Sequence, residues 1–139
     1  MEYPASKLNP KWVTGEVIID NNVVKWLESF GKFLANSRAD EPKPITASQI
    51  RKFFGEVKKI EADFDRKKNE IVMLTPKLAY AVGRDYNSHN RRANSKIEEF
   101  HQEIKTGISA VGVEKSNFNN LVNIIEGIVA YHRFYGGKV

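Results

Sequence analysis

The basic side chains between positions 51 and 66 recur at helical intervals. Lys52, Lys59 and Arg66 are seven residues apart, and Arg51 and Lys58 form a neighbouring row with the same interval. Residues seven apart lie along one side of an α-helix, about 10 Å from each other. Such rows of cations suit a phosphate backbone, which gains free energy by releasing condensed counterions when they bind. The spacing therefore predicts a polyanion-binding face that ignores base sequence, because lysine is a point charge.

Three other parts of the chain could extend this face. Gln49 stands at the start of the same segment, where a helix N-terminus and a side-chain amide favour a phosphate. Arg84 follows Lys77 by seven residues and predicts a third basic row. His132 and Arg133 leave the apolar stripe of the last segment, so we expect them to join a basic surface.

The positive charge of the chain is concentrated in its middle third. Residues 46–96 contain twelve Lys or Arg and six Asp or Glu, whereas the formal net charge of the whole chain is +5. A concentrated basic segment is the electrostatic footprint of nucleic-acid binding. A solvated helix surface rich in lysine has the same composition, so charge by itself leaves both interpretations open.

Apolar residues recur at steps of three and four along most of the chain, which predicts amphipathic helices. Thr46 and Gln49 fit a capping box at the start of the basic segment, and the polar stretch at 87–94 predicts a loop. We therefore expect an all-α protein, with one domain over 1–139, an irregular segment at 1–19 and about five helices. The expected helices cover residues 20–34, 46–73, 75–86, 97–111 and 116–135.

The basic segment is long enough to raise the question of self-association. Residues 46–73 contain no proline and one glycine, so we expect a single helix of ~42 Å, in a domain with a radius of gyration of ~14 Å. Its far end would expose apolar side chains unless a second copy covered them, which predicts a homodimer for the isolated protein. A kink near Asn69 that folds 71–74 back is the alternative. The apolar positions concerned are Ile60, Phe64, Ile71 and Val72.

Residues that could perform catalysis are few. The chain has no cysteine, and its three histidines, His89, His101 and His132, are too scattered for a metal site. Glu98, Glu99 and Glu103 have the spacing of a solvated helix face. We therefore predict no enzymatic activity, no metal and no cofactor.

An enzyme that uses His132 with Glu126 is a weaker hypothesis, because six residues separate the two by about 240° around a helix. No stretch approaches the ~18 apolar residues of a membrane span, so we expect a cytoplasmic protein without membrane contact. The tyrosines Tyr80, Tyr131 and Tyr135 are expected in the core with a wet hydroxyl.

Three blocks of the sequence resemble a known family. They are ITASQIRKF at 45–53, LTPKLAYAVGR at 74–84, and residues 118–138, which end in EGIVAYHRFYGGK. In this order they resemble the small subunit of type III-A CRISPR effector complexes, and they cover about half of residues 45–139. Residues 1–44 match no part of the family pattern. Small subunits of sister complexes are also short, helical and basic, so the role is better defined than the subtype.

The resemblance implies a non-catalytic subunit, present in several copies and stacked beside the backbone and large subunits of the complex. It would line the groove where target RNA pairs with guide RNA and hold the RNA backbone. A helical adaptor whose basic face meets an acidic protein partner stays an alternative. Transferred to this chain, the RNA contacts fall on Gln49, Arg51, Lys52, Lys59, Arg84, His132 and Arg133.

Overall fold

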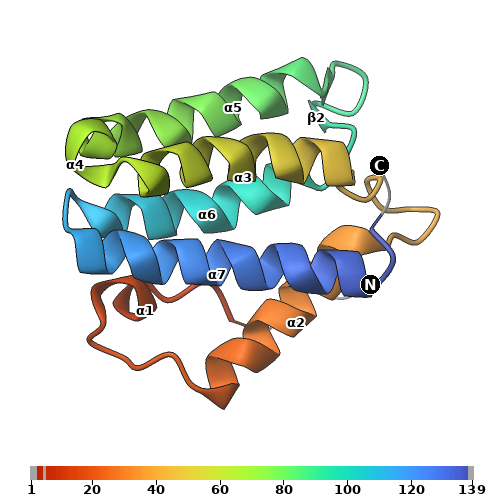
Figure 1. Cartoon of the computed structure of the whole chain (residues 1–139). Helices are drawn as coiled ribbons and strands as arrows, with labels where there is room; N and C mark the ends of the chain where they lie inside the picture. Colours follow the sequence, from red (N-terminus) through yellow and green to blue (C-terminus); the bar gives the residue numbers. More distant parts are fainter. Residues whose placement is uncertain (1–2, 5, 138–139) are drawn as a thin grey trace.

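The computed structural model describes residues 3–4 and 6–137 of the chain (Figure 1). Within these ranges the β-structure consists of one short hairpin and an isolated bridge between Lys43 and Ser95. The prediction of an all-α protein is confirmed. The elements are, in chain order, α1 (Pro10–Thr14), α2 (Asn21–Ala35), α3 (Ala47–Ala62), α4 (Phe64–Lys67), the 3-10 helix η1 (Lys68–Met73), α5 (Leu74–Arg84), β1 (Tyr86–Asn87), β2 (Arg92–Ala93), α6 (Ile97–Val111) and α7 (Lys115–Phe134).

Helix α7 packs against α1, α2, α3 and α6, and α5 lies on the far side of α3 and α6 (Figure 1). Glycines allow α2 and α7 to approach closely. A Cβ on Gly31 of α2 would lie 2.6 Å from the Cβ of Tyr131, and a Cβ on Gly127 of α7 would lie 2.6 Å from Leu27 Cδ1. Glycine is required at position 31, because the His132 backbone nitrogen would also lie 2.9 Å from the added Cβ. At position 127 an added Cβ would force the Leu27 side chain to move. The buried apolar residues of α7 include Phe118, Leu121, Val122, Ile124, Ile125 and Ile128.

The prediction of one helix over 46–73 is wrong in its second half. Helix α3 ends before Asp63, which is non-helical (φ −143°, ψ 53°), and the chain continues through α4 and η1 into α5. The break lets Phe64 and Ile71 enter the core, where the Phe64 ring lies 5.7 Å from that of Phe118. Burying a large apolar side chain contributes about 1.5–3 kcal/mol, which exceeds the net value of about 1 kcal/mol for a helical hydrogen bond lost at the break.

The same break removes the argument for self-association from helix length. Ile60, Phe64 and Ile71 are buried within this chain, and Val72 is the one of the four expected positions that is exposed, at 70%. The homodimer stays a prediction that light scattering at several concentrations can test. It no longer follows from an exposed helix end.

The N-terminal segment, expected to be irregular, contains the short helix α1 and is anchored on α6. The carboxylate of Glu103 accepts a hydrogen bond of 2.9 Å from the Leu8 amide and another from the Tyr3 hydroxyl, and lies 3.7 Å from Lys7 Nζ. The prediction that Glu103 belongs to a solvated face is therefore wrong, because its side chain is buried. Burial and the neighbouring Glu103 carboxylate raise the pKa of Tyr3.

The stretch predicted as a loop at 87–94 forms a two-residue antiparallel hairpin, in which Tyr86 pairs with Ala93. Arg91 occupies the turn with a left-handed φ of 56°. Asp85, the residue before β1, supplies two acceptors for the connection between β2 and α6. The Asp85 carbonyl accepts from the Asn94 amide at 2.8 Å, and its carboxylate accepts from the Ser95 amide at 2.9 Å.

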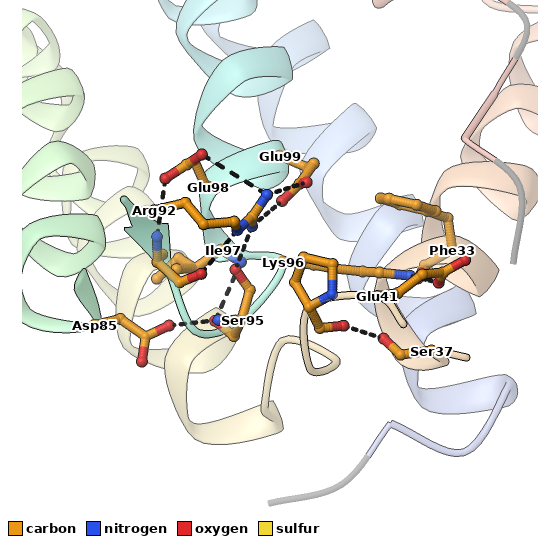
Figure 2. Close-up of polar contacts among 12 residues, drawn as sticks. Phe33, Ser37, Glu41, Asp85, Arg92, Ser95, Lys96, Ile97, Glu98 and Glu99 are labelled. Carbon is orange, nitrogen blue, oxygen red and sulfur yellow. Dashed lines mark hydrogen bonds and ion pairs between the residues drawn. The ribbon is translucent and has the colours of Figure 1, made fainter. Parts of the chain in front are cut away.

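A buried ammonium group joins the start of α6 to the end of α2 (Figure 2). Lys96 is 1% exposed. Its Nζ donates to the carbonyl oxygens of Phe33 at 2.9 Å and Asn36 at 2.7 Å, and lies 3.0 Å from the Glu41 carboxylate. It also lies 3.8 Å from the centre of the Phe33 ring. The hydrogen bond from Lys96 lowers the pKa of Glu41 to about 2.

Further polar contacts beside Lys96 hold the hairpin in place (Figure 2). The Arg92 guanidinium forms two hydrogen bonds of 2.9 Å to the Glu99 carboxylate, the bidentate geometry that fixes orientation. Backbone bonds connect the Lys43 amide to the Asn94 carbonyl at 2.9 Å and the Lys96 amide to the Lys43 carbonyl at 2.8 Å. The connection between α2 and α3 is therefore tied to the start of α6 on both sides of Lys43.

Replacing Lys96 should test how far the fold depends on this group. Lys96→Met keeps much of the side-chain volume but leaves two carbonyl oxygens without this donor and removes one of several partners of Glu41. We expect the free energy of unfolding to fall by about 3 kcal/mol, the range for losing one partner of a buried ion pair. Urea denaturation followed by circular dichroism measures the change. Lys25→Met, at an exposed position, should change it by less than about 0.5 kcal/mol, and equal stability of the two variants would contradict the role of Lys96.

Candidate nucleic-acid interface

The N-terminus of α3 is held by the predicted capping box. Thr46 Oγ1 accepts from the Gln49 amide at 3.0 Å, and Gln49 Oε1 accepts from the Thr46 amide at 2.9 Å. Gln49 Nε2 donates to Ser95 Oγ at 3.3 Å. The side chain of Gln49 is therefore occupied by contacts within the protein. Its observed role is to position the basic helix, whereas the RNA contact predicted for it stays a prediction.

The outer side of α3 carries the two predicted basic rows, opposite the buried stripe that includes Ile50, Phe53 and Val57. Arg51 and Lys58 form one row, and Lys52 and Lys59 form the other. All four side chains are exposed. We call these four residues the α3 basic face.

Carboxylates compensate the C-terminal half of this face. Lys58 Nζ lies 2.5 Å from the Glu61 carboxylate, and Lys59 Nζ lies 3.8 Å from Glu56, which also binds Lys77 at 3.1 Å. The hydrogen bond from Lys77 lowers the pKa of Glu56.

The N-terminal half of the face is uncompensated. Arg51 and Lys52 form no ion pair with any residue in the described ranges. Among the described residues, the α3 basic face therefore has its uncompensated charge at Arg51 and Lys52.

Arg84 lies across a groove from α3. This groove, of about 710 Å³, runs between α3 and α5, and Gln49, Lys52 and Arg84 are among its lining residues. The structure thus brings three of the seven predicted residues to one place. Lys77, which the sequence placed in the same basic row as Arg84, lines the groove as well.

His132 and Arg133 do not join this group. Arg133 is exposed on the last turn of α7. His132 is buried, and its Nε2 lies 2.8 Å from the carbonyl oxygen of Ile45, to which it donates. The prediction that the His132 side chain joins a basic surface is therefore wrong. The buried ring instead supports the connection that leads into Thr46, the N-cap of α3. His132 is buried whereas Glu126 is exposed, which argues against an enzyme that uses these two residues together.

One residue that the sequence assigned to the core belongs to the groove. Tyr80 lines it from α5 and is 69% exposed. The Arg84 guanidinium lies 6.0 Å from the centre of the Tyr80 ring. The signal that could have placed it is the helical period of α5, because Leu74 and Leu78 are buried on the opposite side.

Fold and site together define the class of this protein: it is a small helical protein with a basic helix face that is uncompensated in its N-terminal half. In the described ranges no group of three or more His, Asp or Glu side chains could hold a metal ion. None of the described helices is long and apolar enough to cross a membrane.

The comparison with protein families agrees with this class. The sequence model of the family described as Csm2 Type III-A matches residues 21–138. The chain therefore belongs to this family and is a small subunit of a type III-A CRISPR complex, as the resemblance of the three blocks predicted.

A curated relative supports the same assignment. The protein named "CRISPR system Cms protein Csm2", from Streptococcus thermophilus, is 28% identical over 99 residues, which cover 68% of this chain and 75% of the relative. No solved structure matches this chain. The family match begins at residue 21, so α1 lies outside it and α2 lies inside it. The prediction that residues 1–44 match no part of the family pattern is therefore wrong for residues 21–44.

The buried imidazole makes the stability depend on pH. Burial lowers the pKa of His132 below its ordinary value of 6.5, so the folded protein keeps the ring neutral while the unfolded chain takes up a proton. The free energy of unfolding should therefore decrease as the pH falls below 6.5. His132→Gln, which can still donate to the Ile45 carbonyl, should weaken this dependence.

Urea denaturation on either side of pH 6.5 measures the effect. Burial also lowers the pKa of His101, so the double variant His101→Gln/His132→Gln should lose more of the dependence than either single variant. Identical pH profiles for the wild type and His132→Gln would show that the ring is not kept neutral in the fold.

Proposed function

We propose that this small subunit is non-catalytic and holds the backbone of guide and target RNA with the α3 basic face and Arg84, lining the groove in which the two RNAs pair. The observation that carries the proposal is the pair Arg51 and Lys52. Both are exposed and neither has an ion-pair partner in the described ranges, so their charge is available to phosphates. Lys59 and Arg133 are secondary contacts, because one is partly compensated by Glu56 and the other lies on α7.

Backbone contacts are sufficient for a subunit of an RNA-guided complex, because base pairing reads the sequence and the protein reads the shape and charge of the paired strands. Lysine contributes point charges, and the one amide at the start of α3, Gln49, is bound within the protein. The proposed partners are therefore guide RNA, target RNA, and the backbone and large subunits of the complex, in the cytoplasm. Another copy of the chain is the proposed partner in isolation.

Removing either uncompensated cation should weaken RNA binding in a salt-dependent way. Arg51→Ala and Lys52→Ala should each lower the affinity for unrelated single-stranded RNAs by a similar factor. Each should reduce the slope of log K against log salt by about 0.7, the value for one phosphate contact. Fluorescence anisotropy at several salt concentrations measures both quantities.

Lys25→Ala is the matched control for this experiment, since it removes one exposed cation from α2, which does not carry the α3 basic face. It should leave the slope unchanged. Circular dichroism should show the same helicity for all three variants. If Lys25→Ala weakens binding as much as Arg51→Ala, the protein binds RNA through its net charge and the assignment to α3 is wrong.

A glycine at the centre of the α3 basic face supports the proposal. Gly55 is four residues from Arg51 and Lys59 and three from Lys52 and Lys58, so all four cations surround it. A Cβ at Gly55 would meet no atom within 4 Å, so packing within the chain does not require glycine there. Glycine in a helix costs about 0.5–1 kcal/mol relative to alanine. A ligand backbone that approaches the helix closely would explain its presence.

Gly55→Ala should therefore separate stability from binding. We expect it to raise the free energy of unfolding by about 0.5–1 kcal/mol. We also expect it to weaken RNA binding about threefold, because the added methyl group would hold the RNA backbone away from the helix. Gly83→Ala is the control, because Gly83 is also a helical glycine with open space around its Cβ position but lies on α5. Denaturation and RNA titration of both variants decide the matter. Unchanged RNA affinity in Gly55→Ala would contradict the explanation that an RNA backbone approaches α3 closely at Gly55.

A further inference from the structure

The groove between α3 and α5 combines an apolar floor with a charged rim. Phe53, Leu78 and Ile97 line it and are buried, so the floor is formed by core side chains of three helices. Its volume of about 710 Å³ falls within the about 300–1,000 Å³ usual for small-molecule sites. Lys52 belongs to both the α3 basic face and the groove lining. An RNA strand held on the α3 basic face would therefore pass the opening of the groove.

Tyr80 stands at the edge of this groove as an exposed aromatic ring. Its hydroxyl forms no hydrogen bond with a described residue, and 69% of the residue is exposed. Aromatic rings of this kind are the platforms on which proteins stack unpaired bases, because every base has a π-face. Arg84, whose guanidinium is 6.0 Å from the ring centre, leaves a cation beside any base stacked there.

The charges of the rim favour an anionic ligand, such as a nucleotide, over a basic or purely apolar one. Glu56 is compensated by Lys77 at 3.1 Å. Lys52 and Arg84 have no ion-pair partner among the described residues and line the groove from α3 and α5. One oxygen of Asp85 accepts from the Ser95 amide, which leaves the other able to accept from the N–H or amino group of a base.

From this arrangement we infer that the groove binds one unstacked nucleobase of the RNA, stacked on Tyr80, with the adjoining phosphates held by Lys52 and Arg84. The inference rests on the proposed function, since it names what the groove next to the α3 basic face does to an RNA held there. It adds a contribution to affinity that depends on a base and is independent of salt. Stacking tolerates any base, so the site retains the lack of sequence preference.

Two RNAs of equal length distinguish this contribution from backbone binding. One is oligouridylate, and the other has abasic sites in place of its bases and the same number of phosphates. The full-length wild-type protein should bind oligouridylate about tenfold more tightly, within the range for one base stacked on an aromatic ring. Tyr80→Ala should bind both RNAs with the affinity of the wild type for the abasic RNA, while keeping its salt slope.

Two further variants control the measurement. Tyr80→Phe keeps the ring and should keep the preference for oligouridylate. Phe134→Ala removes an exposed aromatic side chain that lies on α7, outside the groove, and should behave as the wild type. Because Tyr80 is exposed, circular dichroism should show a folded protein for every variant.

The possible failures are separable. A wild-type protein that binds neither RNA contradicts the proposed function and, with it, the base site. A wild-type protein that binds both RNAs equally, or a Tyr80→Ala variant that keeps the preference, overturns the base site alone. If Tyr80→Ala keeps the preference for oligouridylate but no longer joins the other subunits of the complex, the groove takes a protein partner and the base site is wrong.

Discussion

The arrangement of this protein depends on the burial of the Lys96 ammonium. A cation removed from water is stable only if oxygen acceptors surround it. The carbonyl groups of Phe33 and Asn36 and the carboxylate of Glu41 supply these acceptors. Phe33 belongs to α2, and the other two acceptors belong to the connection that follows it. The requirement for all three at once holds this connection against the start of α6, and the backbone bonds at Lys43 continue the contact.

The position of α3 follows from that connection. Ile45, at its end, donates its amide to the Leu34 carbonyl at 3.0 Å and accepts from His132. Thr46 then caps the helix together with Gln49, and Gln49 is bound to Ser95, the neighbour of Lys96. The N-terminus of α3 is thus held by contacts from α2, α6 and α7. Rigid placement suits the proposed contact with an RNA backbone, because a fixed row of cations loses less conformational entropy on binding.

The uncompensated charge of α3 is concentrated in its N-terminal half. Lys58 and Lys59 have carboxylate partners one turn away, and Lys77 shares Glu56 from α5. Arg51 and Lys52 have none among the described residues. Counting lysines and arginines would therefore overstate the number of cations available to a phosphate. Under the proposed function, a phosphate would compete with an ion pair for Lys58 or Lys59, at a cost of about 0–1 kcal/mol for each surface pair. At Arg51 and Lys52 it would meet no such competitor among the described residues.

Features that depend on near neighbours in the chain could be predicted from the amino-acid sequence. Helical period placed the apolar stripes and the two basic rows of α3, and the capping box follows from Thr46 and Gln49, because these features need contacts within one or two turns. The burial of polar groups and the ends of helices depend on contacts between distant parts of the chain. Lys96 is 55 residues or more from its three acceptors, and His132 is 87 residues from Ile45. Asp63 ends α3 because Phe64 and Ile71 reach a core formed by distant helices. A buried charge or a helix break is stable only when groups from distant parts of the chain provide partners. The helical period of one segment carries no information about those groups.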